Sequence, residues 1–326
     1  MMSNTKMSRS IFLAAAVVVF AVAGFTGCKT STDNAEELLW KGKAAYEANE
    51  YKNAIKYFTP AAEQGNLEAQ YRLGLTLLYS EGVVAEKLSD LPGSASMEEV
   101  LRVIEEQEEE RKKLESEGAE WLLKAAEQGY APAQYSIGCC YIYGNRGVER
   151  DAARGIEWIR KAAEQDEPHS QNLLAECYAG GKNGVEKDMA EAVKWLRKAG
   201  ENGLIIAQFK LGGYYLNGGV EVYEPEGLSL LGFPGVYNPD GKGIDKNVID
   251  PAEGAKWFRK VAERAEADVQ KNERNRYIEA QHNLGVLYSR GEGVEKDPVE
   301  AEKWYRKAAE QGYEKSKAVL KRLGAE

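Results

Sequence analysis

The feature of this sequence that most constrains its fold is a tryptophan-centred motif that recurs along the chain. The segment from Glu120 to Gly129 reads Glu-Trp-Leu-Leu-Lys-Ala-Ala-Glu-Gln-Gly. A lysine three places after the tryptophan and a glutamate six places after it recur in five copies, and a degenerate copy surrounds Tyr57. The five tryptophans are Trp121, Trp158, Trp195, Trp257 and Trp304. The shortest spacing is 37 residues, which predicts an array of structural repeats, and the longer spacings predict insertions within it.

A second motif predicts the other helix of each unit. It opens with Ala-Gln or Ser-Gln and places Leu-Gly, or a close equivalent, three residues after the glutamine. In four of the five copies a tyrosine follows three residues later, as in Gln281, Leu284, Gly285 and Tyr288. Small and apolar residues at this spacing lie on one face of an amphipathic α-helix. The copies open at positions 69, 133, 170, 207 and 280.

An aspartate seven residues before the tryptophan marks the start of the tryptophan-bearing helix in four units. Its carboxylate can accept hydrogen bonds from the free N–H groups of the first helical turn. Glycines such as Gly129 and Gly312 stand where a C′ glycine ends a helix. Helix–turn–helix units stack so that each covers the apolar face of its neighbour. We therefore predict an all-α fold, a right-handed α-solenoid. The four aspartates are Asp151, Asp188, Asp250 and Asp297.

Together these motifs resemble Sel1-like repeats, a family within the tetratricopeptide-repeat superfamily. The unit over 280–312 carries the family's residues nearly throughout, including Gly291, Gly293, Asp297 and Trp304. The resemblance implies five such repeats, over 69–130, 133–166, 170–203, 207–265 and 280–312. Before them, 36–65 is similar to a plain tetratricopeptide hairpin. After them, 315–326 is expected to form a capping helix.

The N-terminus has the pattern of a secretory targeting segment. Lys6 and Arg9 precede an uncharged apolar run over 11–25, which is shorter than the about 20 residues that a membrane-spanning helix needs. A basic region followed by a short apolar core is typical of a signal peptide, which we predict over 1–27. Two cleavage sites compete, one at the Ala-Val-Ala sequence and one immediately before Cys28.

The sequence before Cys28 resembles a bacterial lipobox, although Phe25 stands where Leu, Val or Ile is usual. The resemblance implies that Cys28 is diacylated, that 28–35 is a lipidated tether, and that the protein contacts a membrane through this lipid. Lys29, in place of an aspartate, is compatible with sorting to the outer membrane. We therefore expect a lipid-anchored protein of the cell envelope that faces the periplasm. Cleavage at the other site would instead leave a soluble periplasmic or secreted protein.

The first repeat contains an acidic insertion over 84–118. Met97, Val100, Leu101 and Ile104 fit one helical face, so we expect a helix here. Nine acidic and four basic residues lie within 97–117. Two interpretations stay open: a solvated helix that shields the array, or an acidic docking site for a basic partner.

The fourth repeat contains an apolar insertion over 220–248. Its aromatic residues are interspersed with prolines and glycines, which exclude a regular helix. This loop either packs back on the solenoid or presents an aromatic surface to a partner. A third, charged insertion over 264–279 is expected to lengthen the two helices that flank it.

Composition disfavours several functional classes. The formal net charge of −9 argues against nucleic acid as a partner. His169 and His282 have no cysteine or histidine at metal-ligand spacing, so we expect no metal and no cofactor. Cys140 and Cys177 occupy equivalent positions in adjacent units, where stacked helices lie about 9–10 Å apart. This spacing favours free thiols, although a bridge from Cys139 or Cys140 to Cys177 stays open.

No nucleophile–base–acid set stands out in the sequence, so we predict that the protein is not an enzyme. A cysteine-rich branch of the resembled family is linked to β-lactam binding or hydrolysis, and its members carry a cysteine pair in each repeat. This chain does not carry such pairs. A β-lactamase-like enzyme is therefore only a remote alternative.

A solenoid exposes a long concave face that accepts extended peptides or protein segments. When the tetratricopeptide pattern is superposed, one position in the first helix of each unit faces this groove. This position lies three residues before the glycine of the Leu-Gly motif. The aromatic residues of 220–248 offer a second surface. The candidate partner-binding residues are Tyr71, Tyr135, Asn172, Phe209, His282, Tyr223, Phe233 and Tyr237. We predict a non-catalytic protein–protein interaction scaffold in the bacterial cell envelope. The alternative is a structural lipoprotein of an envelope assembly, such as polysaccharide export or cell-wall machinery.

Overall fold

A computed structural model describes residues 31–79, 96–217 and 249–325. These residues form thirteen α-helices and one short 3-10 helix, and none of them is in a strand. No helix among them is both long enough and apolar enough to cross a membrane. The first seven are α2 (Ser31–Glu47), α3 (Tyr51–Glu63), α4 (Leu67–Leu78), α7 (Met97–Glu127), α8 (Ala131–Tyr143), α9 (Ala152–Glu164) and α10 (Pro168–Gly180). The others are α11 (Met189–Glu201), α12 (Ile205–Asn217), α13 (Pro251–Ala262), η3 (Glu266–Asp268), α14 (Arg274–Arg290), α15 (Pro298–Glu310) and α16 (Glu314–Leu323).

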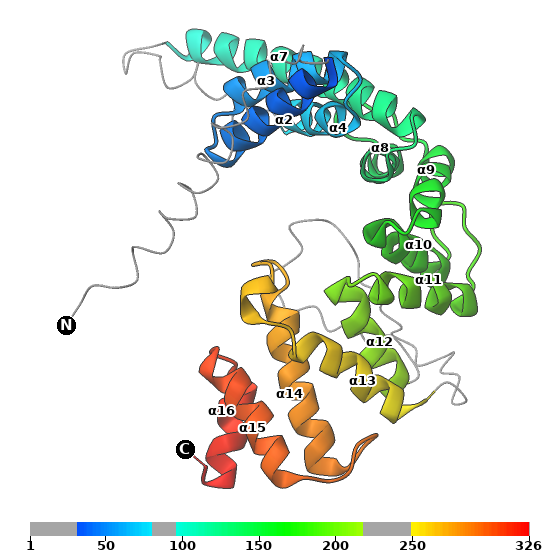
Figure 1. The fold of residues 1–326 in the computed structure, drawn as a ribbon, viewed down its shortest axis with the longest axis vertical. Coiled ribbons are helices and arrows are strands. Elements are labelled where there is room, and N and C mark those ends of the chain that lie inside the picture. The colour runs from blue at the N-terminus through cyan, green and yellow to red at the C-terminus, as the bar shows by residue number, and fades with distance from the viewer. Residues whose placement is uncertain (1–30, 80–95, 218–248, 326) are drawn as a thin grey trace, which may run out of the picture.

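The helices pack as antiparallel pairs that stack in chain order into a curved array (Figure 1). The pairs are α2 with α3, α4 with α7, α8 with α9, α10 with α11, α12 with α13, and α14 with α15. The final helix, α16, packs against α15 and covers the last pair. The predicted fold class is confirmed, because each pair contacts mainly the pairs before and after it, as in an α-solenoid.

In four of the six pairs, the second helix begins at the aspartate that the sequence predicts. The side chain of Asp151 accepts a hydrogen bond from the backbone N–H of Arg154 at 3.0 Å, and Asp188, Asp250 and Asp297 cap α11, α13 and α15 in the same way. Such a cap contributes about 1 kcal/mol. Glycines in the left-handed region follow α3, α7, α11 and α15, with φ of +87° to +92° at Gly65, Gly129, Gly203 and Gly312.

One backbone hydrogen bond closes the loop inside each repeat. The N–H of Asp151 donates to the carbonyl of Tyr141 at 2.8 Å, and the same pair of positions is joined in the three repeats that follow. In the fourth repeat the donor is Asp250 and the acceptor is Tyr215, at 2.9 Å, although the 220–248 insertion separates them. The insertion therefore leaves the local geometry of its repeat intact, which explains how the array accommodates it.

The two helices of a pair cross closely because their contact residues are small. A side chain at Gly138 would place its Cβ 3.0 Å from the carbonyl oxygen of Gly155 and 2.8 Å from Ile159. Gly212 and Gly254 are equally close in the fourth repeat. The Leu-Gly motif thus supplies a leucine to the core and a glycine to the helix crossing.

The lysine that follows each tryptophan covers its indole ring. Lys198 Nζ lies 4.4 Å from the ring of Trp195, and the other four pairs have distances of 4.1 to 4.6 Å. Trp195, Trp257 and Trp304 are buried. The lysine stem shields the apolar ring while its ammonium group stays near water, and a cation–π contact contributes about 0.5–1 kcal/mol at such sites.

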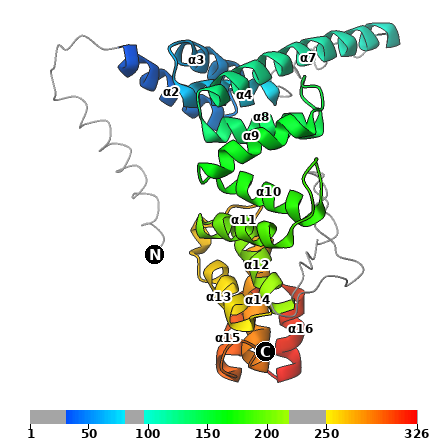
Figure 2. The same ribbon diagram turned by 90° about the vertical axis from the view of Figure 1, so that its right-hand side faces the viewer.

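Three expectations on element boundaries need correction. Residues 31–35, assigned to the tether, are helical, because Ala35 and Leu39 of α2 are buried in the first core cluster and extend its packed helix upstream. The 264–279 insertion lengthens only α14. Helix α13 keeps its ordinary length, and η3 lies between the two. Within 84–118, the expected helix is the first half of α7, continuous with the tryptophan-bearing helix, and it projects from the array instead of shielding it (Figure 2).

In four repeats, a buried glutamine joins the repeat to the helix before it. The amide nitrogen of Gln171 donates to the carbonyl of Ala163, eight residues earlier in α9, at 3.0 Å. Gln70, Gln134 and Gln208 make the same bond at 2.7 to 3.1 Å. These glutamines are at most 5% exposed. Each one therefore fixes its helix against the second helix of the preceding repeat.

The amide oxygen of the same glutamine accepts a bond from its own repeat. Asn202, at the end of α11, donates to Gln171 at 3.0 Å. Gln128, Gln165, Arg264 and Gln311 donate to the corresponding glutamines at 2.7 to 3.2 Å. Three helices thus meet at one buried amide, which we call the glutamine joint.

Replacing the joint residue should destabilise the array. We expect Gln171→Ala to lower the free energy of unfolding by about 2–3 kcal/mol, because the three hydrogen bonds of this side chain, with Ala163, Asp166 and Asn202, and its packing are lost. The control is Gln64→Ala, since Gln64 is exposed and donates only within its own helix, to Pro60; its cost should stay below about 0.5 kcal/mol. Urea denaturation of both variants measures this, and equal costs would contradict a special role for the joint.

Candidate partner-binding surface

The five groove residues predicted on first helices lie along the line where successive first helices meet. Each is half-buried, and each contacts a neighbouring helix of the array. In Figure 1, α8 lies on the inner side of the curve relative to α9. The residues are Tyr71 of α4, Tyr135 of α8, Asn172 of α10, Phe209 of α12 and His282 of α14. The other predicted residues, Tyr223, Phe233, Tyr237 and Cys28, lie outside the described residues.

The N-terminal part of this surface is aromatic. The ring of Tyr71 lies 5.5 Å from that of Tyr130, and the ring of Tyr135 lies 5.7 Å from that of His169 in the next repeat. Burial is the main cause that raises the pKa of Tyr71 and of Tyr135 above its ordinary value. Both phenols therefore stay neutral at physiological pH and offer flat faces with one polar edge.

The centre of the surface is a polar cluster that bridges α10 and α12. The ammonium group of Lys210 contacts the carboxylate of Glu176 and lies 3.2 Å from the amide oxygen of Asn172. The amide nitrogen of Asn172 donates to Glu176 at 3.0 Å. The side chains of Lys210 and Glu176 are only 10% and 23% exposed. We call Asn172, Glu176 and Lys210 the central polar cluster.

The sequence analysis singled out only one member of this cluster. Glu176 lies one helical turn after Asn172, and Lys210 directly follows Phe209. These positions, one helical turn after one groove residue and directly after another, were the sequence signal that could have identified Glu176 and Lys210. Their pairing across two repeats could not be predicted from spacing, because it depends on how far α12 is shifted along α10.

The C-terminal part of the surface combines aromatic rings with a half-buried histidine. Phe209 packs edge-on against Phe258 at 5.3 Å. The Nδ1 atom of His282 lies 2.9 Å from the hydroxyl oxygen of Ser316 in α16, and Tyr305 and Tyr313 lie 5.4 and 5.1 Å from its ring. Ser316 is completely buried, so this serine–histidine contact cannot present a nucleophile to a substrate.

The cysteines have the properties of core residues. Cys139, Cys140 and Cys177 are free thiols. Burial raises the pKa of Cys139 to about 12 and that of Cys140 to about 11, so both are protonated at neutral pH and are poor nucleophiles. Cys139 packs in the same core cluster as Cys177. Within the described ranges, no group of three or more His, Cys, Asp or Glu side chains is placed to hold a metal ion.

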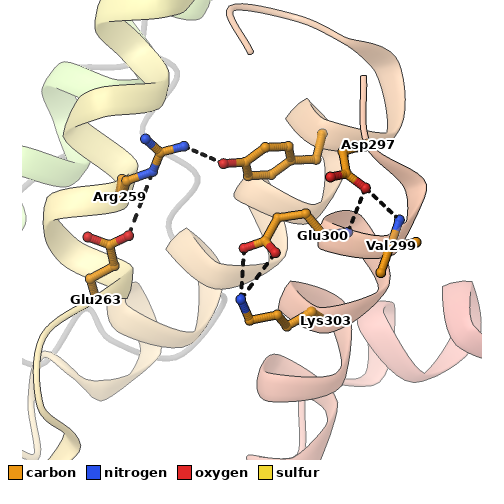
Figure 3. Close-up of polar contacts among 7 residues, drawn as sticks. Arg259, Glu263, Asp297, Val299, Glu300 and Lys303 are labelled. Atoms are coloured by element: carbon orange, nitrogen blue, oxygen red, sulfur yellow. Dashed lines mark hydrogen bonds and ion pairs between the residues drawn. The ribbon is translucent and has the colours of Figure 1, made fainter. Parts of the chain in front are cut away.

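An arginine–tyrosine contact that the sequence analysis missed links adjacent repeats on another side of the helices. The guanidinium groups of Arg160, Arg197 and Arg259 donate to the hydroxyl groups of Tyr178, Tyr215 and Tyr288 in the next repeat. Figure 3 shows Arg259, with Glu263 below it and the Asp297 cap nearby. The sequence signal was an arginine two places after four of the five motif tryptophans, the fourth being Arg306. These tyrosine hydroxyls are therefore engaged within the array.

The stacked helix pairs, with an inner surface that differs from repeat to repeat, define a helical-repeat protein of the solenoid class. The sequence profile of the Sel1 repeat family matches residues 35–66, 67–87, 111–130, 131–167, 168–204, 205–224, 225–265 and 278–313. The matches cover more than half of the chain, which therefore belongs to the Sel1 repeat family. They include the hairpin at 35–66, which the residue pattern assigned to a plain tetratricopeptide unit. No curated protein matches the chain.

Solved structures that are similar to the chain include the following two. One is c5321, a protective antigen present in uropathogenic Escherichia coli strains and displaying an SLR fold, with 26% identity and a TM-score of 0.55. The match covers 86% of this chain but 47% of c5321, so the chain spans about half of that protein's length. The other is a Sel1 repeat protein from Oxalobacter formigenes, with 24% identity, a TM-score of 0.56, and coverage of 90% of this chain and 91% of that one. The second likeness supports the fold alone.

The half-buried His282 should make the free energy of unfolding depend on pH. Burial, followed by the charge of Lys315, lowers the pKa of His282 to about 4 from 6.5. Below pH 6.5 the unfolded chain binds a proton at this histidine that the folded chain does not bind, so the free energy of unfolding falls between pH 6.5 and 4. Replacing His282 by Asn should flatten this part of the curve. Urea unfolding at pH 7.5, 6.0 and 5.0 measures it, and parallel curves for the two proteins would contradict the assignment.

Proposed function

We propose that this protein is a non-catalytic scaffold of the bacterial cell envelope that binds a segment of a protein or peptide partner along the inner surface of the solenoid. Membership of the Sel1 repeat family supports a role as a protein–protein interaction scaffold. The change of residue type from repeat to repeat supports the inner surface as the binding site. Residues of the glutamine joints and tryptophan–lysine pairs repeat, whereas the groove position is Tyr, Tyr, Asn, Phe and His in turn.

The arrangement favours binding of an extended segment. The groove residues are held by contacts with the adjacent repeat, so little side-chain entropy is lost when a partner binds. Aromatic faces at both ends provide apolar contact, and the central polar cluster provides an ammonium and a carboxylate group that can exchange partners. A segment that crosses the array would therefore place apolar residues at its ends and polar residues at its centre.

A site-specific photocrosslinker tests the inner surface. We expect a crosslinking amino acid at Asn172 to give a discrete adduct with an envelope protein in the bacterium that carries the gene. The matched control places it at Lys194, whose side chain is 60% exposed on α11 of the same repeat, and it should give no such adduct. Equal adducts from both positions, or none from Asn172, would contradict an inner binding surface.

The envelope location is part of the proposal and is supported by the N-terminal pattern that ends at Cys28. If Cys28 carries lipid, then Cys28→Ala should move the protein from the detergent-soluble membrane fraction to the soluble periplasmic fraction, because removal of the acyl chains removes the anchor. Cell fractionation followed by immunoblotting measures the change. Membrane partition that is the same in the variant and the native protein would contradict lipid anchoring.

A further inference from the structure

Helix α7 is more than twice as long as its counterparts in the other repeats. It contains 31 residues, whereas α9, α11 and α15 each contain 13. Only its second half packs against α4, and the first half extends beyond the array (Figure 2). Its start is well defined, because Ser96 and Glu99 form a reciprocal capping box. From Met97 to Glu110, every side chain is exposed or half-buried.

The projecting half of α7 carries an uncovered apolar stripe. Met97 is 74% exposed, Leu101 52% and Ile104 37%, and Val100 lies between them on the same face. At about 100° per residue, these residues lie on the same helix face as Gly118 and Leu122, which are buried against the neighbouring helices in the second half of α7. Glu108, Arg111 and Glu115 lie on this face between the two apolar groups. The stripe is therefore the packing face of a repeat helix that continues past the end of α4.

The acidic charge around this stripe distinguishes among the binding partners that could cover it. Residues 97–110 contain seven glutamates and one arginine. A second copy would bring two strongly acidic helices together, which is unfavourable, and an anionic membrane surface would be repelled in the same way. A helix with apolar residues at i, i+3/i+4 and i+7 and flanking lysines or arginines would satisfy both the stripe and the acidic surroundings.

We propose that the projecting half of α7 is a docking surface for a cationic amphipathic helix of a partner protein. Apolar side chains of that helix cover Met97, Val100, Leu101 and Ile104, and its basic residues lie beside the glutamates. The surface is separate from the inner face, so a partner could be held there while the groove is occupied.

A labelled model peptide tests the proposal. The probe is a designed helical peptide of leucine and lysine with its leucines on one face, and the reference is a scrambled peptide of identical composition and charge. Fluorescence anisotropy with the protein should show at least about tenfold tighter binding of the amphipathic peptide, which corresponds to about 1.4 kcal/mol. Met97→Ser, Leu101→Ser and Ile104→Ser together should abolish that difference.

The matched control removes exposed apolar residues elsewhere. Val299 and Leu323 are 79% and 59% exposed on α15 and α16, and Val299→Ser with Leu323→Ser should leave the preference unchanged. Equal binding of the two peptides by the native protein would overturn the proposal. So would a lower melting temperature of the triple variant without peptide, because the chain itself would then cover the stripe. If sedimentation velocity shows a dimer of the native protein that is absent in the triple variant, then a second copy of the chain covers the stripe instead.

Discussion

The structure depends on a buried amide at each junction between repeats. An unpaired amide in an apolar interior costs several kcal/mol, so each glutamine must lie where one carbonyl and one side-chain donor meet it. Gln171 satisfies this requirement with Ala163 of the preceding repeat and Asn202 of its own. Because a hydrogen bond is directional, the requirement fixes both the rotation and the shift of one helix pair against the next. Apolar stacking alone would fix them less tightly.

Fixed junctions leave other positions free to vary. The groove residues contact adjacent first helices but take no part in the glutamine joints, and their chemistry changes from Tyr135 to Asn172 to Phe209. A binding surface on such a framework can change in specificity without a change in fold. The same reasoning accounts for the insertions: the backbone bond between Asp250 and Tyr215 holds the repeat closed, so the residues between them are not needed to define it.

The half-buried charges and the exposed stripe of α7 differ in what they do for the array. Lys210 and Glu176 satisfy each other and link α10 with α12, so they hold two repeats together while offering charge to the inner surface. Met97 and Leu101 contribute nothing to the junctions, since their helix has left the stack. An apolar face that no repeat covers has no role in the stability of the solenoid, which is why we assign it to a partner.

The sequence alone determined the class of fold, the helix starts at Asp151, Asp188, Asp250 and Asp297, and the helix-ending glycines, because caps and turns depend on residues a few positions apart. It also indicated the groove positions through their place in the repeat, although not their contacts. The partners of Gln171, the Lys210–Glu176 pair, the Arg259–Tyr288 contact and the direction of α7 were decided by tertiary structure. The Gln171–Ala163 bond spans eight positions but crosses from one repeat to the next, and the other contacts join residues at least 29 positions apart. The direction of α7 depends on where a neighbouring helix ends, and residue spacing carries no information on the shift between stacked helices.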